Sequence, residues 1–241
     1  TAFRGFGGPQ GMFAIESVID DIARQLQLDP LAVRHANFYD APPRNTTPYG
    51  MTVEDNVIAP LVSQLALDAD YASRRAAIAA FNAASPVIKR GIALTPVKFG
   101  ISFTATVFNQ AGALVHVYKD GTVQVSHGGT EMGQGLHTKI RQIVAGEFGL
   151  PVADVRLSAT DTRCVPKTSA TAASSSTDLN GKAAQAACRT ICARIAAFVA
   201  GRLGSDAGQV GFADGQVRAP GFNRPFAQVV ADAYRARVQL W

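Results

Sequence analysis

The chain has 241 residues, of which 47% are hydrophobic and 17% are charged, and its formal net charge is +5. This composition excludes a disordered chain, and no run of about 20 apolar residues suggests a membrane span. The basic residues are spread along the chain, which argues against nucleic-acid binding. The cysteines Cys164, Cys188 and Cys192 have neither zinc-ligand nor disulfide-framework spacing, so we expect packed thiols in a reducing compartment.

The first third of the chain is predicted to be helical. Apolar residues recur at helical spacing between Gln10 and Leu28, with acidic residues among them. Asp29-Pro30 joins an N-cap residue to a proline suited to the first helical position, so a second helix begins there. Residues 40–50 are rich in proline and predict a loop. Two further helices are predicted over 52–67 and 71–84.

The rest of the chain predicts strands mixed with helices. Residues 91–129 are rich in alternating and β-branched residues, and Lys119-Asp-Gly121 separates the runs 114–118 and 122–126, which is a strong hairpin signal. The later predicted elements are a helix over 135–148, a strand over 154–159, a hydroxyl-rich loop over 168–177, a long helix capped by Asp178 and ending near Leu203, a turn at Asp214-Gly215 and a helix over 225–237. We therefore predict an α+β fold, with a mixed, mainly antiparallel sheet packed with helices and preceded by a helical segment. The predicted domains are 1–88 and 89–241.

Three segments are unusual enough to carry chemistry. Phe3–Gln10 combines glycines with two aromatic residues and an arginine, but it lacks the dinucleotide-binding fingerprint. Gly128–Gly135 follows a predicted strand and opens a predicted helix, where free backbone N–H groups favour an anion. Thr168–Thr177 supplies small and hydroxyl-bearing residues before the next helix, and such residues can surround a phosphate with hydrogen bonds. Tight-turn packing in the two glycine segments and a solvated linker in the third are the alternatives.

His127, His137 and Glu131 lie in or beside the second of these segments. A histidine titrates near neutral pH and is a candidate for proton transfer, but a packed or capping role is the simpler interpretation. Glu131 is a candidate general base, and an acidic residue at a helix start is the alternative. No Gly-x-Ser-x-Gly nucleophile motif accompanies them.

Taken together, these segments resemble one family, the molybdenum hydroxylases, and within it the molybdenum-binding part of xanthine dehydrogenase. The resemblance extends from residue 1 to about residue 200, more loosely beyond, and its motifs are Thr1-Ala-Phe-Arg-Gly-Phe-Gly-Gly-Pro-Gln10, Lys98-Phe-Gly-Ile-Ser-Phe-Thr104, Asn109-Gln-Ala-Gly-Ala-Leu114, Ser126-His-Gly-Gly-Thr-Glu-Met-Gly-Gln-Gly-Leu-His-Thr138 and Thr171-Ala-Ala-Ser174. The chain resembles an internal fragment of such a protein, truncated at both ends.

The resemblance implies a molybdopterin cofactor whose dithiolene sulfurs hold molybdenum, so that no protein side chain ligates the metal. The residues it implies in cofactor binding are Arg4, Met132, Gly133, Gln134, Ala173, Ser174, Ser176 and Thr177. Phe6 and Phe103 are implied to hold a flat heterocycle between one stacked and one edge-on ring, and Thr104 to hydrogen-bond to it.

The implied reaction is hydroxylation of hypoxanthine or xanthine to urate with oxygen derived from water. Electrons are implied to leave through 2Fe-2S clusters to FAD and NAD, in modules outside this chain that are partners together with the rest of the molybdenum subunit. The family's general-base glutamate belongs to a Gly-Glu-Pro-Pro segment that this sequence lacks. No catalytic residue is therefore assigned, and we expect the chain alone to be inactive. The expected location is the cytoplasm, with no nucleic-acid or membrane partner.

Two alternatives remain open within this interpretation. One is a molybdenum hydroxylase of the aldehyde oxidase type. The other is a non-catalytic cofactor-binding or structural module, in which Glu131 and the histidines only pack and cap. A general anion-binding protein is a third hypothesis, which leaves the aromatic residues unexplained.

Overall fold

The computed structural model describes residues 5–158, 160–161 and 168–241, so Arg4 and Cys164 lie outside the described residues. The chain divides into two compact units, Thr1–Phe99 and Gly100–Trp241, each with its own core. The sequence had suggested a boundary near residue 88, soon after the last helix of the first third. The structure instead keeps the extended segment 89–99 with the helices that precede it.

The first unit consists of helices α1 (Gly8–Leu26), α2 (Pro30–Ala36), α3 (Ile58–Asp68) and α4 (Tyr71–Ala84). Asp29 caps α2 as predicted, because its Oδ1 accepts a hydrogen bond from the Leu31 N–H at 2.7 Å. The buried Arg34 of α2 forms ion pairs with Glu16 and Asp20 of α1. A small core completes the unit and contains Leu31, Val62, Tyr71 and Leu94.

The predicted helix over 52–67 is shorter in the structure and begins at Ile58. Asn56 accounts for the difference, because its Oδ1 accepts from the Ile58 N–H at 3.2 Å while its Nδ2 donates to the Tyr39 carbonyl at 3.0 Å. Asp55 has a left-handed backbone with φ 48°, which a continuous helix excludes. Thr52, the first residue of the predicted helix, pairs instead with Thr46 in an isolated β-bridge.

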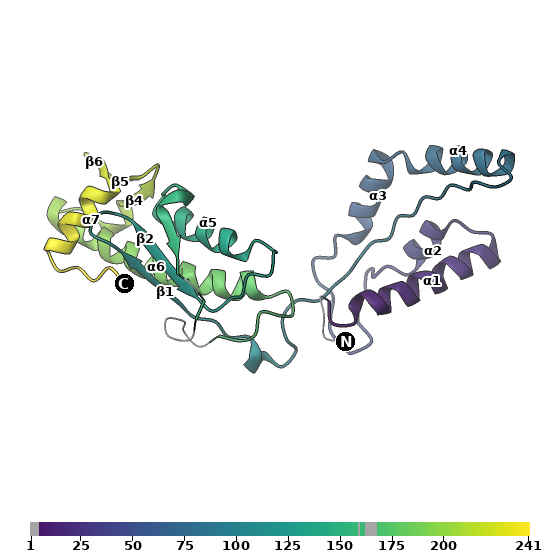
Figure 1. Cartoon of the computed structure of the whole chain (residues 1–241), viewed down its shortest axis with the longest axis horizontal. Coiled ribbons are helices and arrows are strands. Elements are labelled where there is room, and N and C mark those ends of the chain that lie inside the picture. Colours follow the sequence, from purple (N-terminus) through teal and green to yellow (C-terminus); the bar gives the residue numbers. More distant parts are fainter. Residues whose placement is uncertain (1–4, 159, 162–167) are drawn as a thin grey trace. The chain divides into compact units, whose positions relative to one another are not determined.

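The second unit is built on a mixed sheet with the strand order β1-β2-β3. Strand β1 (Ala113–Val117) runs antiparallel to β2 (Val123–His127), and β2 runs parallel to β3 (Val155–Leu157). The parallel pair requires a crossover, which α5 (Leu136–Phe148) provides. The long helix α6 (Ser176–Leu203) packs against α5 and the sheet (Figure 1). Thus β2, α5 and α6 all have one end close to the loops 128–135 and 168–175.

A second, antiparallel sheet follows α6 and consists of β4 (Gly211–Ala213), β5 (Gln216–Ala219) and β6 (Phe222–Pro225), before the last helix α7 (Phe226–Arg235). Both predicted Asp-Gly turns are confirmed, since Asp120-Gly121 lies between β1 and β2 and Asp214-Gly215 between β4 and β5. Asp214 and Gly215 have φ 52° and φ 69°, the backbone that a tight hairpin turn requires.

The main core lies between the first sheet, α5, α6 and α7. Its fully buried large side chains include Phe148, Ile140, Ile191, Ile195 and Phe226. Among the described residues, α6 is the one helix that is long and apolar enough to cross a membrane by length and composition. Such a measure also selects core helices, and Cys188, Ile191 and Ile195 of α6 are buried in this core.

Two further predictions about this unit are corrected. The alternating and β-branched residues of 91–129 favour strands, but residues 91–112 contain none, because no described segment pairs with them through a hydrogen-bonded ladder. Asp178 was predicted to cap α6, but the Leu179 N–H donates to the Ser175 carbonyl at 2.9 Å, so Ser175 is the N-cap. Asp178 therefore lies in the first turn, where a negative charge still favours the helix.

Candidate functional site

Three segments of the second unit are hydrogen-bonded to one another near the starts of α5 and α6. They are the segment 100–110, which includes a 3-10 helix at Thr106–Phe108, the glycine loop 128–135 and the hydroxyl loop 168–175. The bonds that join them run from the Ser102 N–H to the Ala173 carbonyl (2.8 Å), from the Ser169 N–H to the Gln110 carbonyl (2.8 Å) and from the Thr130 N–H to Thr171 Oγ1 (2.8 Å). The sequence predicted the last two segments as separate candidates, and the fold brings them together.

The glycine loop is closed by its own carboxylate. Glu131 Oε1 accepts from the backbone N–H groups of Gly133 at 2.9 Å and Gly135 at 3.0 Å, and Oε2 accepts from that of His137 at 3.0 Å. These bonds, above all the one from His137, lower the pKa of the Glu131 carboxyl. Glu131 therefore occupies the amides of Gly135 and His137 at the start of α5, and it is an acidic residue at a helix start rather than a free base.

The start of α6 is open. The N-cap Ser175 makes no side-chain cap, because its hydroxyl donates to the Ala172 carbonyl at 3.1 Å instead. The first amides of a helix have no partner within the helix, and those of Ser176 and Thr177 have none among the described residues either. Ala173 and Ser174 precede them with φ 54° and φ 55°, a left-handed backbone that turns successive N–H groups toward one side. This combination is an anion cradle at the positive end of a 28-residue helix.

Hydrogen bonds within the glycine loop fix the positions of its predicted cofactor-binding residues. Gln134 Nε2 donates to the Thr130 carbonyl at 2.9 Å, and its Oε1 accepts from the Met132 N–H at 2.6 Å. A carboxamide has one further N–H and one further lone pair, so Gln134 keeps the capacity to bind a ligand. Gly133 has φ 92°, and a side chain there would meet no atom within 4 Å, which leaves the outer side of the loop open.

Phe103 is held by a neighbour that the sequence did not single out for a role. The Phe103 N–H donates to Asn109 Oδ1 at 3.0 Å, and Asn109 Nδ2 donates to the Phe103 carbonyl at 2.8 Å. The ring of Phe103 meets that of Phe108 edge to face, with centroids 6.0 Å apart. Thr104 follows and is exposed. Asn109 thus fixes the backbone at the predicted substrate-binding residues. The only signal in the sequence for this role is that Asn109 belongs to one of the family motifs.

The N-terminal glycine segment belongs to the first unit. Phe6 has φ 52° and a side chain that is 79% exposed, and Gly7 is the N-cap of α1 with φ 92°. A side chain on Gly8 would come within 2.4 Å of the Phe99 ring, so this loop lies directly against Phe99. Phe6 and Phe103 lie in different units, and their pairing stays a prediction.

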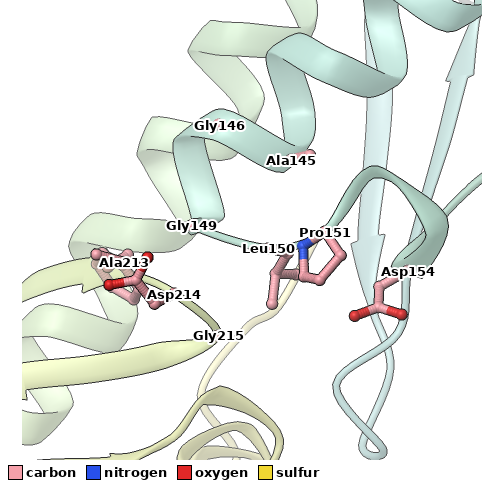
Figure 2. Close-up of a pocket in the computed structure, with 10 residues that line it drawn as sticks. Ala145, Gly146, Gly149, Leu150, Pro151, Asp154, Ala213, Asp214 and Gly215 are labelled. Atoms are coloured by element: carbon pink, nitrogen blue, oxygen red, sulfur yellow. The ribbon is translucent and has the colours of Figure 1, made fainter.

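An open groove of about 730 Å³ lies at the opposite end of α5 from these loops (Figure 2). It is lined by the end of α5, the following loop with Leu150 and Pro151, and the turn between β4 and β5. Its acidic groups, Asp154 and Asp214, and the C-terminus of a helix all repel an anion. The groove is therefore separate from the candidate site.

Burial shifts the pKa values of Cys188, Cys192 and His127. Burial raises the pKa of Cys188, and it raises the pKa of Cys192 to about 12, so both are packed thiols as predicted. Burial, together with the neighbouring His137, lowers the pKa of His127 to about 4. His127 is therefore neutral at physiological pH. The described residues contain no group of three or more histidine, cysteine or acidic side chains that could hold a metal ion.

The α+β fold, the joined loops and the anion cradle define a cofactor-binding domain. A family profile described as "Molybdopterin cofactor-binding domain" matches residues 64–241, and a second profile with the same description matches residues 1–38. The chain belongs to the molybdopterin cofactor-binding domain family.

Relatives with known names are similar over most of the chain. The xanthine dehydrogenase of Blastobotrys adeninivorans is 48% identical over 208 residues, which is 86% of this chain and 15% of that protein. The xanthine dehydrogenase of Oryza sativa subsp. japonica is 41% identical over 240 residues, which is 100% of this chain and 16% of that protein. The chain thus spans about a seventh of the length of these relatives.

Solved structures share the fold at lower identity. The reconstituted CO dehydrogenase from Oligotropha carboxidovorans has a TM-score of 0.76 and 24% identity, over 96% of this chain and 31% of that one. Quinoline 2-oxidoreductase from Pseudomonas putida 86 has a TM-score of 0.69 and 22% identity, over 98% of this chain and 31% of that one. These likenesses support the architecture alone.

Proposed function

We propose that this chain is the part of a xanthine dehydrogenase-type enzyme that holds the molybdenum cofactor, and that the complete protein oxidises the purines hypoxanthine and xanthine. The observation that carries the proposal is the open start of α6, where amides without a partner among the described residues follow a left-handed turn and lie beside the glycine loop. The 48% identity to a xanthine dehydrogenase supports this enzyme as the parent.

The described residues fit a molybdopterin group by the chemistry of their donors. The N–H groups and hydroxyls of Ser176 and Thr177 would bind its phosphate, because a helix start with free amides stabilises an anion. The remaining amide capacity of Gln134 and the open face of Gly133 would bind the pterin, whose ring carries donors and acceptors. The exposed Met132 would cover its apolar side.

The chemistry supplied by the bound cofactor is hydroxylation of a substrate carbon with oxygen derived from water. The chain's own contribution is to bind and orient. Phe103, held by Asn109, presents a ring that would contact a flat heterocycle, and Thr104 offers an exposed hydroxyl for a hydrogen bond to it. The exposed ring of Phe6 would supply the second aromatic contact.

The remaining partners follow from the same proposal. Other segments of the molybdenum subunit would complete the site, and 2Fe-2S and FAD modules would carry the electrons away. A cytoplasmic location is consistent with the free thiols of Cys188 and Cys192.

The experiment that tests the proposal is analysis of the complete protein that contains this chain. We expect molybdenum by elemental analysis and pterin fluorescence after oxidation, both near one equivalent per protein, and faster oxidation of hypoxanthine than of an aldehyde. Absence of both molybdenum and pterin would overturn the proposal. Faster aldehyde turnover would replace the purine enzyme with one of the aldehyde oxidase type.

A further inference from the structure

Three buried polar atoms behind the glycine loop have no hydrogen-bond partner among the described residues. They are His127 Nε2, His137 Nε2 and Asn180 Oδ1. His127 and Asn180 are 1% and 2% exposed. An unpaired polar atom in a protein interior costs about 1–3 kcal/mol. Three of them gathered near one place therefore point to a further group that pairs with them.

The three side chains are neighbours. The rings of His127 and His137 meet edge to face, with centroids 5.4 Å apart. A side chain built on Gly129 would lie 3.1 Å from His127 Nδ1 and 3.1 Å from Asn180 Nδ2, so His127 and Asn180 both lie against this glycine. The unpaired atoms are thus carried by adjacent side chains of the second unit.

The bonds already present determine what each atom can do. His127 Nδ1 accepts from the Gly129 N–H at 3.1 Å, so the proton of this neutral ring lies on Nε2, which is a donor. Asn180 Nδ2 donates to the Ser176 carbonyl at 3.0 Å, so its free Oδ1 is an acceptor. The His137 Nε2 atom accepts or donates according to its tautomer. The cluster therefore offers at least one donor and one acceptor.

A metal ion does not fit this cluster, because the protonated His127 Nε2 has no lone pair to offer. A water molecule does fit, since water both donates and accepts and a buried water typically makes about three hydrogen bonds. We propose that one buried water molecule binds His127 Nε2, His137 Nε2 and Asn180 Oδ1. It accepts from His127, donates to Asn180 and completes its bonding with His137.

This water would join the three elements that present the cofactor loops. His127 ends β2, His137 lies in the first turn of α5, and Asn180 lies near the start of α6. A link among them fixes the distance between the glycine loop and the open amides of α6. His127, His137 and Asn180 are then positioning residues for the cofactor, an assignment that rests on the proposed function.

The test is a crystal structure of the complete protein at a resolution that shows ordered water, for the native sequence and for N180L and H137F. Each substitution keeps the approximate size of the side chain and removes one partner. We expect density for a water about 2.7–3.2 Å from all three atoms in the native protein and no such water in either variant. Molybdenum content should fall about tenfold in both variants, by analogy with outer partners of other metal sites.

Ser205→Ala is the matched control. It removes a hydroxyl that is also buried and unpaired among the described residues but lies beyond the far end of α6. We expect it to leave the water and the molybdenum content unchanged.

Native density that shows the three atoms bonded to protein groups, or no water between them, would overturn the inference whatever the molybdenum content. A water in place in a native protein without molybdenum would support the water site and contradict only the proposed function. If one variant does not fold, the native density and the other variant still decide.

Discussion

Helices α5 and α6 follow similar sequences, but the backbone amides at their starts have different hydrogen-bond partners. Each follows a loop of small or hydroxyl-bearing residues, and each start was predicted as a place for an anion. In α5 the amides of Gly133, Gly135 and His137 are bound by Glu131. In α6 the amides of Ser176 and Thr177 have no partner among the described residues. Amides that are already bound to a carboxylate cannot also bind a phosphate. The start of α6 is therefore the candidate phosphate site, and the glycine loop is not.

The two loops have different roles in binding the cofactor. The carboxylate of Glu131 holds the glycine loop in one conformation, which presents Met132, Gly133 and Gln134 in a defined arrangement. At the start of α6 the amides of Ser176 and Thr177 have no partner among the described residues, so they can bind an anionic ligand. Changes at α5 should therefore affect folding first, and changes at α6 should affect cofactor binding first.

The largest effect is expected for Leu136→Ala, at the first residue of α5. Leu136 is fully buried, and its Cδ2 atom approaches Gly129 so closely that no side chain fits there. Loss of this packing should lower the free energy of unfolding by about 3 kcal/mol. Denaturant titration of the chain measures it. Leu65→Ala on α3, where the side chain is 49% exposed, is the control and should cost about 0.5 kcal/mol or less. An equal loss of unfolding free energy in both variants would contradict a stabilising role for the packing of Leu136.

The second largest effect is expected for the pH dependence of stability that His127 causes. Its pKa is about 4 in the folded chain, below the ordinary value of about 6.5 in the unfolded chain. Between these values the unfolded state binds more protons, so stability is lost as the pH falls from about 6.5 to about 4, by roughly 2 kcal/mol. Unfolding measured across this range should show the loss in the native chain and much less of it in H127Q. His116→Gln, on the half-buried β1 position, is the control and should keep the full loss.

Ser176→Asp places a carboxylate at the start of α6, where α5 already has Glu131 beside its own start. The new carboxylate would occupy the free amides, so cofactor affinity should fall at least about tenfold, or about 1.4 kcal/mol. The stability of the helix should stay equal or rise by about 0.3–1 kcal/mol, because the charge lies at its positive end. Molybdenum content and thermal unfolding of the same samples give both numbers. Thr190→Asp, exposed in the middle of α6, adds the same charge and should leave molybdenum content unchanged. Parallel loss in both variants would show that charge alone, not the cradle, is responsible.

The smallest effect is expected for Glu131→Gln. Glutamine keeps one acceptor oxygen but loses the charge, so the melting temperature should fall modestly at neutral pH. Because hydrogen bonds from the His137, Gly135 and Gly133 amides lower the Glu131 pKa, the stability that this carboxylate adds is present above its ordinary pKa. It is lost as the pH falls through the lowered value. The native chain and the variant should therefore melt at different temperatures at pH 7 and converge in acid. A constant difference at every pH would mean that shape, not charge, explains the effect.

The amino-acid sequence by itself determined the helices at α2, α4 and α5, both Asp-Gly turns and the α+β class. These features depend on local rules, such as the Asp29 cap and the left-handed turn at Asp214-Gly215, which operate within a few residues. The family motifs also indicated which loops form the candidate site. Errors arose where distant groups compete, as at Asn56, whose bond to the Tyr39 carbonyl helps to fix the start of α3.

Only the tertiary structure decided which of the two predicted anion sites is open. Nothing in the order of residues shows that Glu131 turns back onto three amides while the Ser175 hydroxyl turns away from its helix. The same holds for the clamp of Asn109 on Phe103 and for the unpaired atoms of His127, His137 and Asn180. Most of these bonds join residues only two to six positions apart. A hydrogen bond still depends on distance and angle in space, and a short loop can form several different sets of bonds until its packing in the folded chain selects one.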